Sequence, residues 1–295
     1  MSTNVLLAVT GLGLGALYFM VASGLSLIFG LMRVLNFAHG AFLTLGAYGG
    51  WLVGRALADD GLSTGSFVLT LLVGTVVGAA VAVLTELLLI RPLYRREIDQ
   101  VLVTVGLTLA IGALLGGIAG HDPRRVPTPD WLRDTTEIAG ARIPNDRFVA
   151  IALGVLVLVA LTVFLRRTRY GLIVRAGVEN RDMVTALGID VRTAFTLVFS
   201  IGGAAAGLGG VLAGYYFGSV TPLLGDGLLI FAFIVVVIGG LGSILGSALA
   251  AIAVAMLQQF ANYYAAAGVG NLSVVLLLAA VLLVRPAGLL GKEHQ

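Results

Sequence analysis

Few side chains in this sequence could carry acid–base or binding chemistry, and some of them interrupt long apolar runs. Asn36 and His39 lie in LMRVLNFAHGAF, and Glu86 lies in TELLLIRPLYRR. Polar and ionisable groups are costly to bury in lipid, so each is a candidate for function. On a continuous helix, Asn36 and His39 would share one face because they are three residues apart. We expect this edge, with Gly40 and Thr44 beside it, to line a path through the membrane.

Each candidate also has a structural interpretation. Asn36 and His39 could instead satisfy neighbouring backbone groups near the membrane interface. For Glu86 we favour an ion pair with Arg91, which lies a little over one helical turn away, over a carboxylate that lines the path. His121 and His294 fall in predicted loops and are given no role.

The sequence lacks the P-loop motif of nucleotide binding and the helical motif of zinc proteases. There is no G-x-x-x-x-G-K-[ST] and no H-E-x-x-H. The absence of cysteine excludes disulfides, thiolate metal sites and a cysteine nucleophile. Proton- or sodium-coupled carriers usually hold buried acidic residues, and only Glu86 lies near a span interior. These features predict no enzyme, no metal site and no cofactor in the chain, and they favour transport energised by another subunit.

Composition and apolar runs set the architecture that must position these residues. The chain is 59% hydrophobic and 11% charged, with a mean hydropathy of +1.04. Soluble domains are about 25% charged, so we expect an all-α, polytopic membrane helix bundle that forms a single permease domain over 1–295. The first run has no basic flank and is interpreted as a retained span. The runs, which allow about eight to ten membrane elements, are 5–30, 34–54, 66–90, 101–119, 148–165, 195–217, 227–240, 243–263 and 271–284.

The basic residues predict the orientation of the bundle. With an odd number of crossings, one side holds most of the arginines, and by the positive-inside rule this side is cytoplasmic. The N-terminus is then outside and the C-terminus inside a bacterial plasma membrane, with 120–147 as an outward-facing loop. The residues assigned to the cytoplasmic side are Arg33, Arg91, Arg95, Arg96, Arg166, Arg167, Arg169, Arg175, Arg181, Arg192, Arg285 and Lys292.

Glycines inside the spans predict close helix packing. In 195–217, four glycines share one helix face, and three further pairs follow a small-xxx-small pattern. The segments that begin at Gly40 and Gly242 have a similar Gly-small-apolar pattern, which suggests an internal repeat without establishing one. The glycines concerned are Gly203, Gly207, Gly210 and Gly214, with the pairs Gly74/Gly78, Gly112/Gly116 and Gly242/Gly246.

A polar loop, 166–194, stands between two apolar runs and contains RAGVENRDMVTALGID. We expect Asn180 to cap a helix of about two turns that begins near Arg181. Met183, Ala186 and Leu187 would form its apolar stripe, and Gly188 would end it in a left-handed conformation. A helix this short is marginal in water, so it would need a partner surface. The alternative is a loop helix packed on its own bundle.

These stretches resemble a known family. GLSLIFGLMRVLNFAHGAFLTLGAY, RAGVENRDMVTALGID and FAFIVVVIGGLGSILGSALAA are similar to segments of the branched-chain amino-acid ABC-transporter permeases, and the likeness runs from about residue 10 to 290. The resemblance implies a second homologous permease subunit, two cytoplasmic ATP-binding subunits that bind the ATP, and an extracytoplasmic substrate-binding protein. No nucleic acid is implied.

The resemblance also assigns residues. The segment from Asn180 to Leu187 would be a coupling helix that docks on the ATPase, with Arg175, Glu179 and Arg181 as its charged rim. Asn36, His39 and Gly40 fall in the first-half motif near the path. The family's solutes include branched-chain and other amino acids, urea and short amides, so the substrate stays open. The alternative function is a stand-alone, ion-coupled carrier or channel for a small neutral solute; an intramembrane enzyme that uses His39 or Glu86 would lack a second catalytic group.

Overall fold

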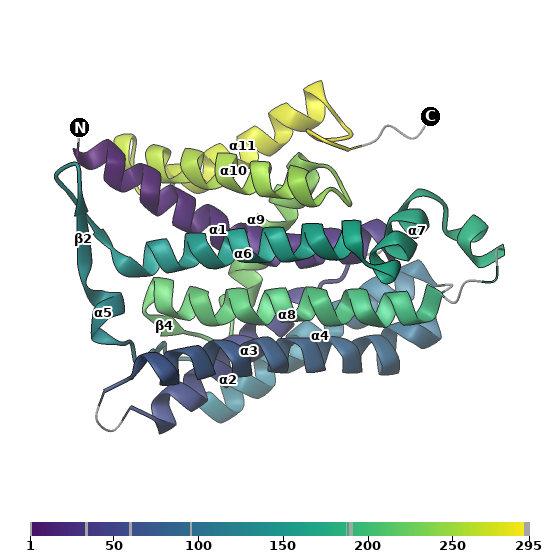
Figure 1. The fold of residues 1–295 in the computed structure, drawn as a ribbon, viewed down its shortest axis with the longest axis horizontal. Coiled ribbons are helices and arrows are strands. Elements are labelled where there is room, and N and C mark those ends of the chain that lie inside the picture. Colours follow the sequence, from purple (N-terminus) through teal and green to yellow (C-terminus); the bar gives the residue numbers. More distant parts are fainter. Residues whose placement is uncertain are drawn as a thin grey trace.

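The computed structural model describes residues 2–32, 35–58, 61–94, 96–186, 188 and 191–291. In this part of the chain, most of the long apolar helices run side by side along one axis (Figure 1). Each coincides with one of the apolar runs in the sequence, which confirms the all-α bundle. Their bounds are α1 Ser2–Met32, α2 His39–Ala56, α3 Thr64–Thr85, α4 Glu97–Ala119, α6 Asn145–Arg167, α8 Val191–Phe217, α9 Leu224–Gly239, α10 Ile244–Tyr264 and α11 Val269–Val284.

The lengths of these helices define a multi-pass membrane protein. Among the described residues, 6 helices are long and apolar enough to cross a membrane: α1, α3 with its extension, α4, α6, α8 and α10. The extension of α3 consists of a π-helical turn, η1 (Glu86–Ile90), and a 3-10 turn, η2 (Arg91–Leu93). Pro92 lacks the N–H that a regular helix needs at this point. α9 and α11, with 16 residues each, are shorter apolar helices, as the short run 227–240 predicted for α9.

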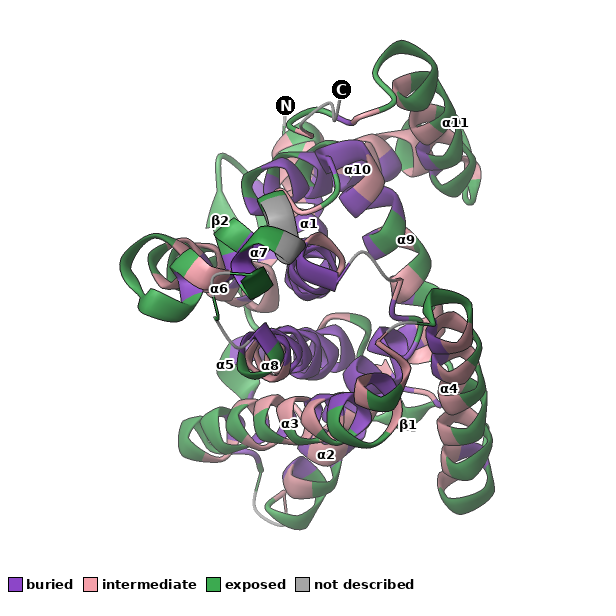
Figure 2. Cartoon of the chain, turned by 90° about the vertical axis from the view of Figure 1, so that its right-hand side faces the viewer, coloured by how far each residue is buried: buried purple, intermediate pink, exposed green. Residues whose placement is uncertain are grey.

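Two helices form the centre of the bundle. α1 packs against α6, α8, α9 and α10, whereas α8 packs against α1, α2 and α3. In the end-on view of Figure 2, α1 and α8 are mostly buried, while α4 and α11 show long exposed stretches. In the apolar 18-residue stretch of each helix, 67% is buried inside the bundle for α8 but only 11% for α4. The outer surface of α4 therefore faces lipid or another protein.

Glycines allow α3 and α8 to approach closely. Gly203 and Gly207 of α8 lie against Gly78 of α3, and a Cβ atom added at Gly78 would stand 2.8 Å from the Cα atom of Gly207. The predicted glycine face of α8 is therefore a packing face. Gly112 is different, because a Cβ atom there would meet nothing within 4 Å in the described chain.

The remaining elements gather at the two ends of the bundle (Figure 1). The N-terminus lies at one end with two small antiparallel pairs of strands, β1 with β4 and β2 with β3. The helix α7 and the last described residues lie at the other end. The bounds of these elements are β1 Arg124–Arg125, α5 Asp130–Arg133, β2 Thr135–Ile138, β3 Ala141–Pro144, α7 Arg169–Ala186 and β4 Ser219–Val220.

Candidate functional site

The chain before α2 turns inside the bundle instead of continuing as a helix. The Oδ1 atom of Asn36 accepts a hydrogen bond from the backbone nitrogen of Ala38 at 3.1 Å. The backbone oxygen of Asn36 accepts another from the nitrogen of His39 at 3.2 Å. Asparagine favours such turns because its side chain replaces a backbone acceptor. The continuous helix on which Asn36 and His39 would share a face is therefore absent here, since α2 begins only at His39.

His39 is fully buried against the middle of α1. Its Nε2 atom lies 3.0 Å from the backbone oxygen of Val21. Its Cε1 atom is 2.8 Å from the place that a Cβ atom would take at Gly24. A hydrogen bond from the His39 ring to a backbone group is what the structural interpretation of His39 predicts. That His39 lies on a translocation path stays a prediction.

Gly40 and Thr44 join α2 to α9. The Thr44 hydroxyl donates to the backbone oxygen of Gly40 at 3.1 Å and accepts a hydrogen bond from the nitrogen of Gly225 at 3.0 Å. The backbone of Gly40 lies so close to Gly225 that a Cβ atom on Gly225 would collide with it. Glycine at both positions therefore allows the two helices to cross almost in contact.

Both of these helices begin inside the bundle. α2 starts beside Val21, far from either end of α1, and α9 starts where Gly225 meets the first turn of α2. The first N–H groups of a helix lack partners within the helix, and they give its start a partial positive charge. In membrane transporters, discontinuous helices of this kind mark the central substrate site.

A cavity of about 500 Å³ adjoins this crossing. Its walls are mostly apolar and include Leu109 of α4, Leu229 and Phe233 of α9. Three polar residues also line it: Thr108 of α4, Asn36, whose side chain is almost wholly buried, and Asp226 in the first turn of α9. Of the predicted path residues, only Asn36 lies on this cavity.

Asp226 lies in the first turn of α9, at the level of the crossing with α2, and was not among the predicted path residues. The sequence signal for this placement is its position directly before the apolar run GLLIFAFIVVV, which makes it a first-turn residue of a membrane helix.

A second polar cluster, which the sequence interpretation missed, flanks α9. The Tyr18 hydroxyl donates to Oε1 of Gln258 at 2.7 Å, and Nε2 of Gln258 donates to Oδ1 of Asn271 at 2.7 Å. These residues line a cavity of about 450 Å³ together with Phe231 of α9. The sequence signal for this cluster is the presence of Gln258 and Asn271 in or beside the last two apolar runs, where polar side chains are costly to bury.

The ion pair predicted for Glu86 is present. Glu86 is fully buried, and Nε of Arg91 lies 3.3 Å from its Oε1 atom. The Thr196 hydroxyl of α8 donates to Oε2 at 2.8 Å, and Tyr94 also donates to this carboxylate. Burial, and then this hydrogen bond, raise the pKa of Tyr94. Glu86 therefore ties the end of α3 to α8, which is a structural task.

The polar loop forms a longer helix than expected. α7 runs from Arg169 to Ala186 without interruption, so Asn180 lies inside the helix and cannot be its N-cap. The predicted start near Arg181 and the predicted two turns are both wrong, because the helical segment extends back to the end of α6 through GLIVRAGV. Gly188 has φ +77 and stands just after the helix, as predicted for its terminator. Leu187 lies outside the described residues.

One side of α7 contacts the bundle and another is exposed. Val184 is buried, whereas Met183 is 64% exposed and Ala186 is exposed as well. Arg175 and Glu179 line a cavity of about 500 Å³ at the base of α7. Met183 and Ala186 of the apolar stripe predicted for a partner are thus on the surface, while Arg175 and Glu179 of the predicted charged rim lie at the junction with the bundle.

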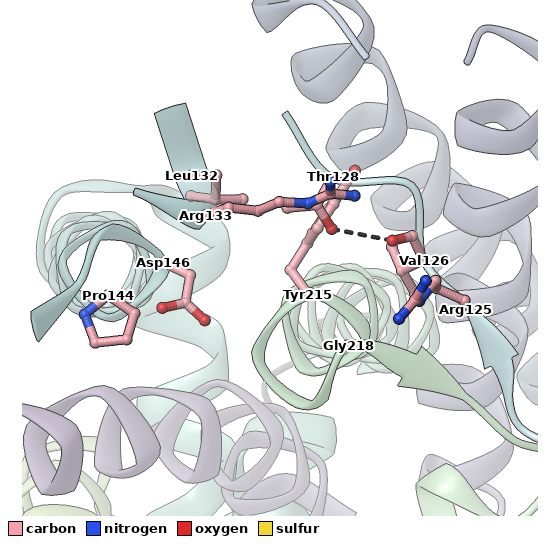
Figure 3. Close-up of a pocket in the computed structure, with 9 residues that line it drawn as sticks. All are labelled: Arg125, Val126, Thr128, Leu132, Arg133, Pro144, Asp146, Tyr215 and Gly218. Atoms are coloured by element: carbon pink, nitrogen blue, oxygen red, sulfur yellow. Dashed lines mark hydrogen bonds between the residues drawn. The ribbon is translucent and has the colours of Figure 1, made fainter. Parts of the chain in front are cut away.

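The opposite end of the bundle holds a polar pocket of about 430 Å³. Its side chains come from the segment 125–133, from the start of α6 and from the end of α8 (Figure 3). Arg125, Arg133 and Asp146 give it a mixed charge, and the Thr128 hydroxyl donates to the backbone oxygen of Val126 at 3.0 Å.

The bundle of membrane-length helices, two of which begin at depth, defines a multi-pass membrane protein with α7 exposed at one end. The model of the family described as "branched-chain amino acid transport system / permease component" matches residues 7–285. The chain belongs to this family, whose members are one component of a larger transport system.

Curated relatives extend over nearly the whole chain. The high-affinity branched-chain amino acid transport system permease protein LivH of Escherichia coli is 28% identical, covering 96% of this chain and 94% of its own length. BraD of Pseudomonas aeruginosa, a protein of the same description, is 27% identical with 97% and 95% covered. A probable branched-chain amino acid transport permease protein LivH of Methanocaldococcus jannaschii is 27% identical with 93% and 88% covered.

Proposed function

We propose that this chain is the membrane-spanning subunit of an ATP-binding-cassette importer for branched-chain or related amino acids. The match of the family model to residues 7–285 carries the proposal, and the names of the relatives point to the same substrates. The whole chain, 1–295, acts as one permease domain in a bacterial plasma membrane. It binds no ATP and no metal itself.

The arginines support an orientation with α7 in the cytoplasm. Arg166 and Arg167 end α6, Arg169 begins α7 and Arg192 lies at the start of α8, so all four are at the α7 end of the bundle. The opposite end carries Asp130 and other acidic residues. By the positive-inside rule, the N-terminus is outside and the C-terminus is cytoplasmic.

In this orientation, α7 is the coupling element to the ATP-binding subunits. Its exposed Met183 and Ala186 would enter an apolar cleft of the ATPase, beside Arg181 and Asn180 on the same helix. A helix face with exposed apolar residues on a charged background suits such a docking mode. Arg175 and Glu179, at the base of α7, would transmit its movement to the bundle.

The second permease subunit would pack on α4. The exposed residues Gly106, Ala110, Ala113 and Gly117 recur at helical spacing and lie on one face of α4. A Cβ atom at Gly106 or Gly117 would meet nothing within 4 Å. Lipid does not require small residues, whereas a closely packed helix does. The polar pocket at the opposite end from α7 would contact the extracytoplasmic binding protein.

Reconstitution tests this function. The chain is purified with its co-encoded partner subunits and placed in proteoliposomes with the binding protein, and uptake of radiolabelled leucine is measured with and without ATP. Uptake should require ATP and the binding protein. Leucine uptake by the chain alone, without ATP, would support the stand-alone carrier instead.

A further inference from the structure

The cavity at the crossing of α2 and α9 has an unusual combination of walls. Apolar side chains from α1, α4, α9 and α11 line it, together with Phe37. α4 is attached to this wall because the Thr108 hydroxyl donates to the backbone oxygen of Phe37 at 3.0 Å. A volume of about 500 Å³ lies within the usual range for small-molecule sites, about 300–1,000 Å³.

Asn36 supplies an unused hydrogen-bond donor to this cavity. Its side chain is 2% exposed, and its Oδ1 atom is occupied by the nitrogen of Ala38. Its Nδ2 atom has no hydrogen-bond partner among the described residues. A buried donor without a partner is destabilising, so the cavity favours a ligand that brings an acceptor.

Asp226 supplies an unpaired negative charge to the same cavity. Among the described residues, no lysine or arginine lies within ion-pair distance of its carboxylate. The partial positive charge at the start of α9 stabilises the Asp226 carboxylate in its first turn. It does not replace a cationic partner. The cavity therefore also favours a ligand with a cationic group.

We propose that this cavity is a transport subsite for an α-amino acid with an apolar side chain, a proposal that rests on the proposed function. The ammonium group pairs with Asp226, the carboxylate accepts from Nδ2 of Asn36, and the side chain packs against Leu109, Leu229 and Phe233. One charge, one amide donor and an apolar wall complement the three parts of such a zwitterion. Since α4 borders the cavity, the subsite lies beside the surface proposed for the second permease.

The subsite makes a specific prediction about the reconstituted complex. Asp226→Asn and Asn36→Asp should each lower ATP-dependent uptake of radiolabelled leucine about tenfold, the effect of losing one charge-assisted hydrogen bond. Stimulation of ATP hydrolysis by the loaded binding protein should stay near the wild-type rate, and the subunits should still co-purify. Asp226→Glu should retain more uptake than Asp226→Asn because it keeps the charge.

Two further variants distinguish a transport subsite from a groove that lipid fills. Asp99→Asn removes a first-turn carboxylate from α4 instead of α9 and should leave uptake unchanged. Val105→Trp fills the cavity and should block uptake. Wild-type uptake in both Asp226→Asn and Val105→Trp would overturn the subsite and leave a lipid-filled groove. A wild-type complex that takes up no leucine would overturn the proposed function as well, so the two failures are distinguishable.

Discussion

The Thr44 hydroxyl accepts a hydrogen bond from the backbone nitrogen of Gly225 at 3.0 Å. This bond links the first turn of α9 to α2, at the point where both helices begin inside the bundle. It satisfies one of the N–H groups that a helix start leaves open, at a buried position.

Thr44→Val tests this link. Valine keeps the shape of threonine but leaves the Gly225 nitrogen without an acceptor, so the free energy of unfolding should fall by about 1–3 kcal/mol. Thermal unfolding of the purified protein in detergent measures the change. Thr44→Ser, which keeps the hydroxyl, serves as the control, and equal unfolding temperatures for Val and Ser would contradict the assigned role.

Glu86 and Arg91 should be energetically coupled. Because Glu86 is fully buried and Arg91 is only 38% exposed, Glu86→Gln should destabilise the protein, and Arg91→Gln should do so too. The double variant should lose less than the sum of the two, with a coupling energy of about 1 kcal/mol. Chemical denaturation of the four proteins closes this cycle, and additive losses would show that the ion pair contributes nothing.

The sequence predicts more of the fold than of the candidate site. Apolar length alone locates helices such as α6 and α10, because lipid requires the backbone to be satisfied within each helix. It cannot say that α2 starts at depth, since that start depends on how Asn36 hydrogen-bonds to Ala38. It also cannot pair Asn36 with Asp226, which are brought to one cavity only by the tertiary crossing of α2 and α9.

Local rules failed at α7 for a related reason. Asn180 is a good N-cap residue, and the sequence after it is a plausible short helix. The chain from Arg169 onward is also helical, however, and it packs on α6 and α1. Tertiary contacts therefore override the local cap signal.

The exposed side of α7 should be needed for coupling. Ala186→Trp adds bulk where the ATPase is proposed to dock and should reduce ATP-dependent uptake and co-purification of the ATPase, while the chain remains folded in the membrane. Ala267→Trp adds the same bulk to an exposed site beyond α10 and should have no effect. Normal uptake in Ala186→Trp would remove the docking role of this face.

The small-residue face of α4 should be an intersubunit surface. A Cβ atom at Gly106 would meet nothing within 4 Å in the described chain, so Gly106→Leu should not lower the unfolding temperature of the isolated subunit. It should nevertheless reduce co-purification of the second permease, because the added side chain separates the helices. Ala280→Leu, at an exposed site on α11, is the matched control, and equal recovery of the partner in both variants would argue that α4 faces lipid.

The orientation can be tested directly because the chain has no cysteine. Met183→Cys and Ala267→Cys place single thiols at exposed positions, on α7 and beyond α10 respectively. The positive-inside rule puts Met183 in the cytoplasm and Ala267 outside. A membrane-impermeant maleimide should therefore label Ala267→Cys in intact cells and Met183→Cys only in inverted vesicles. The opposite pattern would reverse the assignment of both ends, and with it the docking of the ATPase at α7.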